Sequence, residues 1–317
     1  MLAVGLLVNA LAGTACAREK SPQAQSNFIP AQDKLEYYNP EVPEQVTIAG
    51  ELVDLDREDL RERLDRELTS MAYNHSTTML VLKRANKYFP LIAPILKKNG
   101  IPDDFVYLAA IESSLTYRAY SPKKAAGMWQ FIAQTGKEFG LEVGEEVDER
   151  YDPEKSTVAA CKYLKKAYAK FGSWTAVAAS YNAGMTGISK MMDNQLVDNY
   201  FDLYLTEETS RYVFRMIAMK MMLENPRKYG FILTPEQLYQ PVDYTTETVS
   251  GPVESWAKWA KERGVTYSQL REMNPWIRST KLTNKAGKTY TVKIPVQSQL
   301  YRSKREIKVY NQNWVSD

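Results

Sequence analysis

The sequence predicts a mainly α-helical protein that ends in a small α+β module. Apolar residues recur at three- and four-residue spacings through most of residues 56–222, which is the period of amphipathic helices. Alternation typical of strands is confined to two short segments, near residues 243 and 290. The chain has 317 residues, enough for about two domains, and its 44% hydrophobic and 25% charged residues are those of an ordinary globular protein.

The overall charge and the histidine content exclude several classes of function. The formal net charge of +3, from 41 Lys and Arg against 38 Asp and Glu, is too close to balance to indicate a nucleic-acid partner. His75 is the only histidine, which argues against Ser-His-Asp triads, Cys-His pairs and histidine-rich zinc sites. The sequence has no metal or nucleotide motif, so we expect no cofactor. Any chemistry is expected to depend on carboxylates and hydroxyls.

Residues 1–17 are predicted to be a signal peptide or a lipoprotein signal. They are apolar but too short for a membrane-spanning helix, as in the core of a secretory signal. Two processing routes fit them: cleavage at the small residues of Ala15-Cys16-Ala17, or a loose bacterial lipobox, Gly13-Thr14-Ala15-Cys16, that would make Cys16 a lipidation site. Either route places the mature chain outside the cytoplasm. Residues 18–50, rich in Pro, Gln, Asn and Glu, are expected to form a tether.

Residues 51–96 are expected to form an N-terminal helical region. Within residues 56–71, leucines at helical spacing lie among alternating charges, which predicts a solvated helix that packs one edge on a core. Residues 75–100 are more apolar, but Pro90 and Pro94 interrupt them, so we expect two short helices with a turn between them. No strand is expected before the C-terminal module.

The helix expected after Pro102 carries a candidate catalytic group. Phe105, Leu108 and Leu115 define one face by their spacing, and Glu112 falls on that face. A carboxyl group on a buried face resists ionisation unless it is paired. Glu112 is therefore a candidate general acid with a raised pKa. The alternative is a structural Glu that is satisfied by a salt bridge or by a neighbouring helix terminus.

Three later segments also have helical patterns. Residues 157–171 place Cys161 on an apolar stripe, which predicts a small core residue rather than a nucleophile. Ser173 and Gly184 are positioned to begin and end the next helix. A third, Met-rich helix is expected over residues 205–222.

Residues 240–297 are expected to form a small module of their own. Their pattern is a strand, two short helices and a second strand, which together make a βααβ unit. Residues 298–317 form a basic tail without a usable pattern. The four elements of the module are expected at residues 243–249, 253–263, 268–274 and 290–295.

Four short motifs are spread along the helical part of the chain. They are Ile111-Glu112-Ser113-Ser114, Ala126-Gly127-Met128-Trp129-Gln130-Phe131, Ala179-Ser180-Tyr181-Asn182-Ala183-Gly184 and Glu208-Thr209-Ser210-Arg211-Tyr212-Val213. With these motifs in this order, the sequence resembles the lytic transglycosylases of bacterial cell walls, and most of all their membrane-bound lytic murein transglycosylase D branch. The resemblance implies a lysozyme-like, or SLT, α-helical domain over residues 97–235.

The family cleaves the β-1,4 bond between N-acetylmuramic acid and N-acetylglucosamine in peptidoglycan without water. The resemblance implies that Glu112 first protonates the glycosidic oxygen and then takes a proton from the muramyl C6 hydroxyl, which closes a 1,6-anhydro ring. One carboxyl group with a raised pKa can perform both transfers, whereas a glycoside hydrolase normally uses a second carboxylate. The alternatives are a hydrolytic lysozyme on the same fold and a catalytically idle peptidoglycan-binding scaffold.

The resemblance also implies a set of substrate-binding residues around the catalytic acid. For each of them the alternative is a packed side chain, and for Ser113 it is a hydroxyl bonded to the helix backbone. The set comprises Ser113, Met128, Gln130, Tyr181, Asn182, Glu208 and Tyr212.

The C-terminal module resembles a LysM glycan-binding domain. The likeness lies in Gly264-Val265-Thr266-Tyr267-Ser268-Gln269-Leu270 and in Met273-Asn274-Pro275. The module departs from the pattern at Pro252-Val253, where the family has Asp-Thr. The two resemblances together imply a peptidoglycan partner and a periplasmic, cell-envelope location, with Cys16 anchoring an outer-membrane lipoprotein if the lipobox is used.

Overall fold

The computed structural model describes residues 38–316. The predicted signal at residues 1–17, with Cys16, and most of the predicted tether lie outside the described residues. From Asn39 onward the chain forms one compact unit. Its α-helices are α1 Glu58–Tyr73, α2 His75–Lys98, α3 Phe105–Ser113, α4 Ala133–Glu138, α5 Pro153–Phe171, α6 Trp174–Ala183, α7 Met185–Gln195, α8 Glu207–Glu224, α9 Trp256–Glu262 and α10 Tyr267–Met273.

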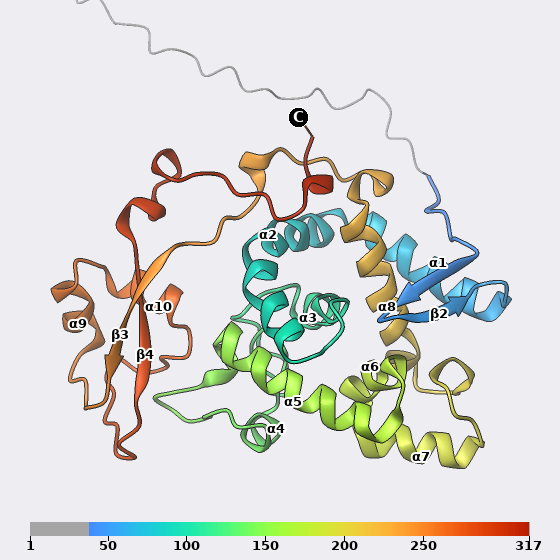
Figure 1. Ribbon diagram of the computed structural model, residues 1–317, viewed down its shortest axis with the longest axis horizontal. Coiled ribbons are helices and arrows are strands. Elements are labelled where there is room, and N and C mark those ends of the chain that lie inside the picture. The colour runs from blue at the N-terminus through green and yellow to red at the C-terminus, as the bar shows by residue number, and fades with distance from the viewer. Residues whose placement is uncertain (1–37, 317) are drawn as a thin grey trace, which may run out of the picture. The chain divides into compact units, whose positions relative to one another are not determined.

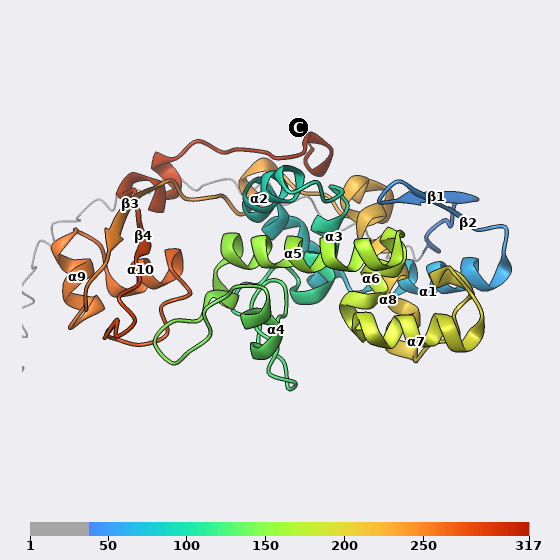
Figure 2. The ribbon, with the colours of Figure 1, turned by 60° about the horizontal axis from the view of Figure 1, so that its bottom comes forward.

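The short helix α3 lies at the centre of the helical domain. Figures 1 and 2 show it surrounded by α2, α5 and α8. Every residue of α3 from Phe105 to Ile111 is buried, so the helix has no solvated face. Such a helix is held by packing on all sides rather than by its own propensity. It is therefore a rigid support for the residue that follows Ile111.

Capping residues explain where the helices next to α3 begin and end. The Asp152 side chain accepts hydrogen bonds from the first backbone N–H groups of α5, with Pro153 in the first turn, and Gly172 ends that helix in a left-handed conformation. The Ser173 hydroxyl caps α6, and Gly184 follows its last residue, as the sequence predicted. The two helices that these caps delimit pack against each other.

The prediction that no strand precedes the C-terminal module is wrong. Two antiparallel strands, β1 Gln45–Ile48 and β2 Glu51–Asp54, form a hairpin, and β1 lies within the predicted tether. Ala49 and Gly50 both have positive φ, which is the geometry of a two-residue hairpin turn. The hairpin has a partner in the helical domain, because the Glu51 carboxylate accepts hydrogen bonds from the backbone N–H groups that begin α6.

The prediction of two short helices at residues 75–100 is also wrong, since α2 runs unbroken through Pro90 and Pro94. Each proline costs about 3 kcal/mol inside a helix. Each fully buried large apolar side chain contributes roughly 1.5–3 kcal/mol. The apolar face of α2 outweighs the two prolines because it buries Val81, Leu82, Ala85, Phe89, Ile92 and Leu96, all at most 2% exposed.

The C-terminal module has the predicted βααβ order. Strands β3 Tyr244–Val249 and β4 Tyr290–Pro295 pair antiparallel along their whole length, and α9 and α10 lie between them in sequence. A capping box of Thr266 and Gln269 begins α10. The core of the module is built on Trp256, Leu270, Ile277 and Val292. The predicted fold class, mainly α with a small α+β module, is confirmed.

The basic tail returns to the helical domain, which its sequence did not indicate. Trp314 is buried and donates its indole N–H to the carbonyl of Leu223. The buried amide of Asn86 on α2 donates to the carbonyl of Lys308 and accepts from the N–H of Tyr310. Figure 1 shows the red segment that precedes the C terminus beside α2. Over residues 38–316, no helix has the length and apolar character needed to cross a membrane.

Candidate active site

Glu112 occupies the last turn of α3, where the chain leaves the core. The helix stops at once, because Ser114 and Leu115 both have positive φ. This conformation is uncommon for residues other than glycine and costs about 1–2 kcal/mol at each position. The buried Leu115 side chain anchors the turn. Glu112 is thus held at the end of a rigid helix with its side chain partly exposed.

Most of the predicted site residues line one pocket of about 660 Å³ around Glu112. They come from segments far apart in the sequence: the end of α3, the loop before α4, the end of α6 and the start of α8. The predicted residues that line this pocket are Glu112, Gln130, Tyr181, Asn182, Glu208 and Tyr212.

Burial raises the pKa of the Glu112 carboxyl group to about 7. The Tyr212 hydroxyl donates a hydrogen bond to the carboxylate, which lowers this pKa, and the Arg215 charge lowers it further. Glu208 has a small effect in the opposite direction. Burial and the neighbouring Glu112 hold the pKa of Tyr212 well above its usual value, so the phenol remains a neutral donor. Near neutral pH, Glu112 is therefore present in both its protonated and its charged form.

Tyr181 packs beside Glu112 without bonding to it. The Tyr181 hydroxyl donates to the backbone carbonyl of Trp129 at 2.8 Å, and its ring contacts those of Phe131 and Tyr163. Burial, followed by the nearby Glu112 charge, holds the pKa of Tyr181 well above its usual value. Tyr181 therefore connects α6 to the loop that carries Gln130.

Asn182 and Glu208 join the end of α6 to the start of α8. The Asn182 amide donates to Glu208 at 3.3 Å and accepts a hydrogen bond from the Thr209 hydroxyl at 2.9 Å. Glu208 is exposed and lies 3.8 Å from the Lys123 ammonium. Glu112 and Glu208 are the only acids among the described residues that line the pocket. The two carboxyl groups thus have different surroundings, one desolvated and the other solvated.

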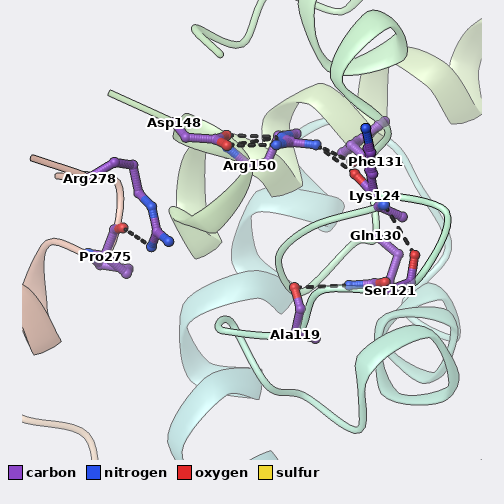
Figure 3. Close-up of polar contacts among 10 residues, drawn as sticks. Ala119, Ser121, Lys124, Gln130, Phe131, Asp148, Arg150, Pro275 and Arg278 are labelled. Carbon is purple, nitrogen blue, oxygen red and sulfur yellow. Dashed lines mark hydrogen bonds and ion pairs between the residues drawn. The ribbon is translucent and has the colours of Figure 1, made fainter. Parts of the chain in front are cut away.

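The loop that carries Gln130 is fastened by Arg150. Figure 3 shows the Arg150 guanidinium between the Asp148 carboxylate, at 2.7 Å, and the carbonyls of Lys124 and Phe131, at 3.0 and 3.1 Å. The Arg150 side chain is only 8% exposed. Gln130 itself has positive φ and donates to the carbonyl of Gly127 at 2.7 Å. No pattern in the sequence indicated Arg150, because an isolated charged residue carries no periodic signal.

Two predicted residues do not line the pocket. The Met128 side chain is fully buried in the core, because the turn around Gly127 directs it inward while Gln130 faces the pocket. The Ser113 hydroxyl bonds to the carbonyl of Ala109 and accepts from the N–H of Thr116. Ser113 therefore fits the alternative of a hydroxyl bonded to the helix backbone. Cys161, also as predicted, is a buried thiol, and burial raises its pKa to about 11.

Comparison with known protein families agrees with the motifs. Residues 90–197 match the transglycosylase SLT domain, and residues 245–298 match the soluble lytic transglycosylase C-terminal LysM-like domain. The chain therefore contains an SLT domain followed by a LysM-like domain. The resemblance predicted from the sequence motifs is confirmed.

The chain is similar to proteins from Escherichia coli and from an Alteromonas species. It is 31% identical over 228 residues to the membrane-bound lytic murein transglycosylase D of Escherichia coli (strain K12), which covers 70% of this chain and 49% of that protein. It is 28% identical over 123 residues to a putative tributyltin chloride resistance protein of Alteromonas sp. (strain M-1), covering 38% of this chain and 59% of that protein. The chain thus spans about half the length of the transglycosylase D that it matches.

Two solved structures show limited likeness. The 70 kDa soluble lytic transglycosylase of Escherichia coli aligns with a TM-score of 0.39 at 20% identity, covering 51% of this chain and 30% of that chain. An inactive mutant of the lytic transglycosylase Slt from Pseudomonas aeruginosa aligns with a TM-score of 0.33 at 19% identity, covering 40% of this chain and 22% of that chain.

Proposed function

We propose that this protein is a peptidoglycan lytic transglycosylase. It would cleave the β-1,4 bond between N-acetylmuramic acid and N-acetylglucosamine without water and form 1,6-anhydromuropeptides. The observation that carries the proposal is the placement of Glu112 in the pocket, where this largely buried carboxyl group, with a pKa raised to about 7, accepts a hydrogen bond from the Tyr212 hydroxyl. The SLT domain match and the identity to transglycosylase D support the same activity.

The proposed reaction uses Glu112 twice. In the first step the protonated carboxyl group gives its proton to the glycosidic oxygen as the bond from that oxygen to the muramyl C1 breaks. In the second step the resulting carboxylate takes the proton of the muramyl C6 hydroxyl, whose oxygen bonds to C1 and closes the anhydro ring. Glu112 ends protonated, ready for the next cycle. A pKa near the working pH suits a group that must both give and take a proton.

The neighbours of Glu112 fit this sequence of steps. The Tyr212 hydroxyl bonds to the carboxylate and so stabilises the charged form that exists between the two transfers. Gln130, Tyr181, Asn182 and Glu208 would bind the sugar rings along the pocket. A hydrolase would need a second carboxylate to act as a nucleophile or to activate water. Glu208, which is exposed and bonded to Asn182, is poorly suited to that task.

The mass of the products tests the activity directly. The full chain is incubated with purified peptidoglycan, and the released fragments are weighed by mass spectrometry. We expect anhydro-muropeptides, which are one water lighter than hydrolysis products. Products with reducing ends would instead support the lysozyme alternative, and the absence of release together with retained wall binding would support the idle scaffold.

Tyr212→Phe is expected to move the alkaline limit of activity to higher pH. The free enzyme needs protonated Glu112, so kcat/KM should be full below a pH of about 7 and fall above it. The Tyr212→Phe variant lacks a hydrogen bond that lowers the pKa of Glu112, so its kcat/KM should begin to fall at a higher pH. Tyr200→Phe is the matched control, because that buried hydroxyl bonds to the carbonyls of Thr209 and Ser210, away from Glu112. An unshifted limit in Tyr212→Phe would contradict the proposed role of Tyr212.

We further propose a cell-envelope location and separate functions for the segments of the chain. Residues 97–235 would be catalytic, and residues 240–297 would bind glycan. Residues 1–17 would direct export to the periplasm, with Cys16 either removed or acylated as an outer-membrane anchor. The membrane-bound relative supports the envelope location. Mass spectrometry of the mature N terminus would distinguish a chain that begins with acylated Cys16 from one that has lost Cys16.

A further inference from the structure

A second concave surface lies where the C-terminal module meets the helical domain. The segment before α5 pairs with the module through hydrogen bonds from the N–H of Asp148 to the carbonyl of Trp276, at 2.9 Å, and from the N–H of Arg278 to the carbonyl of Glu146, at 2.8 Å. The adjoining concavity has a volume of about 930 Å³. Four arginines and two carboxylates line it, so it carries an excess of positive charge.

Arg278 presents an unpaired guanidinium group to this surface. Its side chain is stacked over the ring of Tyr151, with 4.0 Å between the guanidinium carbon and the ring centroid. The guanidinium donates one long hydrogen bond, to the carbonyl of Pro275 at 3.4 Å, as Figure 3 shows. Among the described residues, no carboxylate forms an ion pair with Arg278. Stacking on an aromatic ring fixes the guanidinium while leaving its other donors available.

Arg271 is held in a similar way on α10. It donates to the Tyr267 hydroxyl at 2.7 Å and lies over that ring. Its Nε is buried and has no hydrogen-bond partner within residues 38–316. Like Arg278, it has no ion-pair partner in that part of the chain.

The other two arginines of this surface are already paired with carboxylates. Arg150 is paired with Asp148, and Arg118 is paired with Glu272. The remaining acid, Glu145, is exposed and forms no ion pair among the described residues. Arg271 and Arg278 are therefore the two lining cations left without a carboxylate, and both are oriented by aromatic rings.

This surface adjoins the Glu112 pocket. Tyr120 lines the arginine surface, and the next residue, Ser121, lines the pocket. The two sites thus lie on either side of one short loop.

We propose that Arg271 and Arg278 bind the carboxylates of the short acidic peptides that branch from peptidoglycan glycan strands. The inference rests on the proposed function, since it takes the same polymer as the substrate. Planar guanidinium groups bind carboxylates in a bidentate way, and the exposed ring of Tyr120 offers apolar surface for a peptide. The arginine surface thereby favours strands that still carry their peptides over bare glycan.

Binding of a synthetic acidic stem tetrapeptide to the full chain tests this site without requiring catalysis. By titration calorimetry, the Arg271→Gln/Arg278→Gln variant should bind the peptide roughly 10- to 100-fold more weakly than the wild type. The same peptide with its carboxylates amidated should bind the wild type equally weakly. Arg302→Gln removes a charge from an exposed position in the tail and should change nothing. Equal binding by the wild type and the double variant would overturn the proposal.

Arg278→Lys provides a second test if the double variant folds poorly. It keeps the charge at an exposed position but loses the planar fork, so peptide affinity should still fall about 10-fold. Unchanged affinity in Arg278→Lys, with unchanged thermal melting, would contradict bidentate carboxylate binding.

Cleavage rates separate this inference from the proposed activity. The wild type should cleave peptide-bearing strands faster than strands stripped of peptides, and the double variant should cleave both at the rate of the stripped strands. If the wild type binds the tetrapeptide but releases no anhydro products, the activity proposal fails and the peptide site stands. If cleavage occurs without any dependence on the peptides or on these arginines, the peptide site fails and the activity stands.

Discussion

Glu112→Gln is expected to lower the release of 1,6-anhydro products by a factor of about 10² to 10⁴, which is the usual contribution of a general acid or base. The amide has the size of the carboxyl group and can still accept the Tyr212 hydrogen bond. It can neither protonate the glycosidic oxygen nor deprotonate the muramyl C6 hydroxyl. Product release is measured by mass spectrometry under single-turnover conditions, with thermal melting to confirm folding.

Glu208→Gln is the matched control for this change. It makes the same substitution in the same pocket, but at an exposed carboxylate bonded to Asn182. We expect mainly a higher KM, because Glu208 would contact sugar rather than transfer a proton. Glu112→Gln should also continue to sediment with insoluble peptidoglycan. Persistent cleavage by Glu112→Gln, or equal loss in both variants, would contradict a one-carboxylate mechanism.

Local patterns in the sequence were sufficient to predict most of the fold. The apolar stripe of α1, the Ser173 cap of α6 and the strands of the C-terminal module all depend on residues within a few positions of one another. Such signals work because helix caps and amphipathic periods are short-range properties. The same reasoning placed Glu112 on an apolar face and predicted its raised pKa.

The errors arose where a distant partner decides the local structure. The β1–β2 hairpin is fixed partly by Glu51, whose carboxylate caps α6 more than a hundred residues later. The tail is ordered by Asn86 and by packing of Trp314 near Leu223. Pro90 remains in α2 because the opposite face of that helix is buried. None of these partners can be read from a sequence window.

The sequence predicted which residues lie near the site more reliably than it predicted which way their side chains point. The motif around Gly127 suggested that Met128 and Gln130 both face the groove, but the positive φ values at Gly127 and Gln130 send Met128 into the core. Arg150 was missed altogether, although it holds the carbonyls on either side of Gln130. A buried arginine that bonds to backbone carbonyls has no motif, since its partners are carbonyls that every residue carries.

The structure makes Gly127 the most sensitive position in the loop that Arg150 fastens. A Cβ atom at residue 127 would lie 1.7 Å from the backbone oxygen of Arg150, and the φ of +80° disfavours any other residue. Overpacking and the left-handed backbone together should make Gly127→Ala at least about 3 kcal/mol less stable. The displaced loop also carries Gln130, so release of anhydro products should fall together with the melting temperature.

Gly100→Ala separates the steric clash from the backbone effect. Gly100 has a similar φ of +68°, but nothing lies within 4 Å of a Cβ atom built there. Its substitution should cost only about 1 kcal/mol, the usual penalty for losing glycine at a positive φ. Differential scanning calorimetry of the two variants therefore isolates the contact with Arg150. Equal destabilisation in Gly127→Ala and Gly100→Ala would mean that the Arg150 backbone can move away from residue 127 without cost. In that case the Arg150 segment does not hold the Gln130 loop in place.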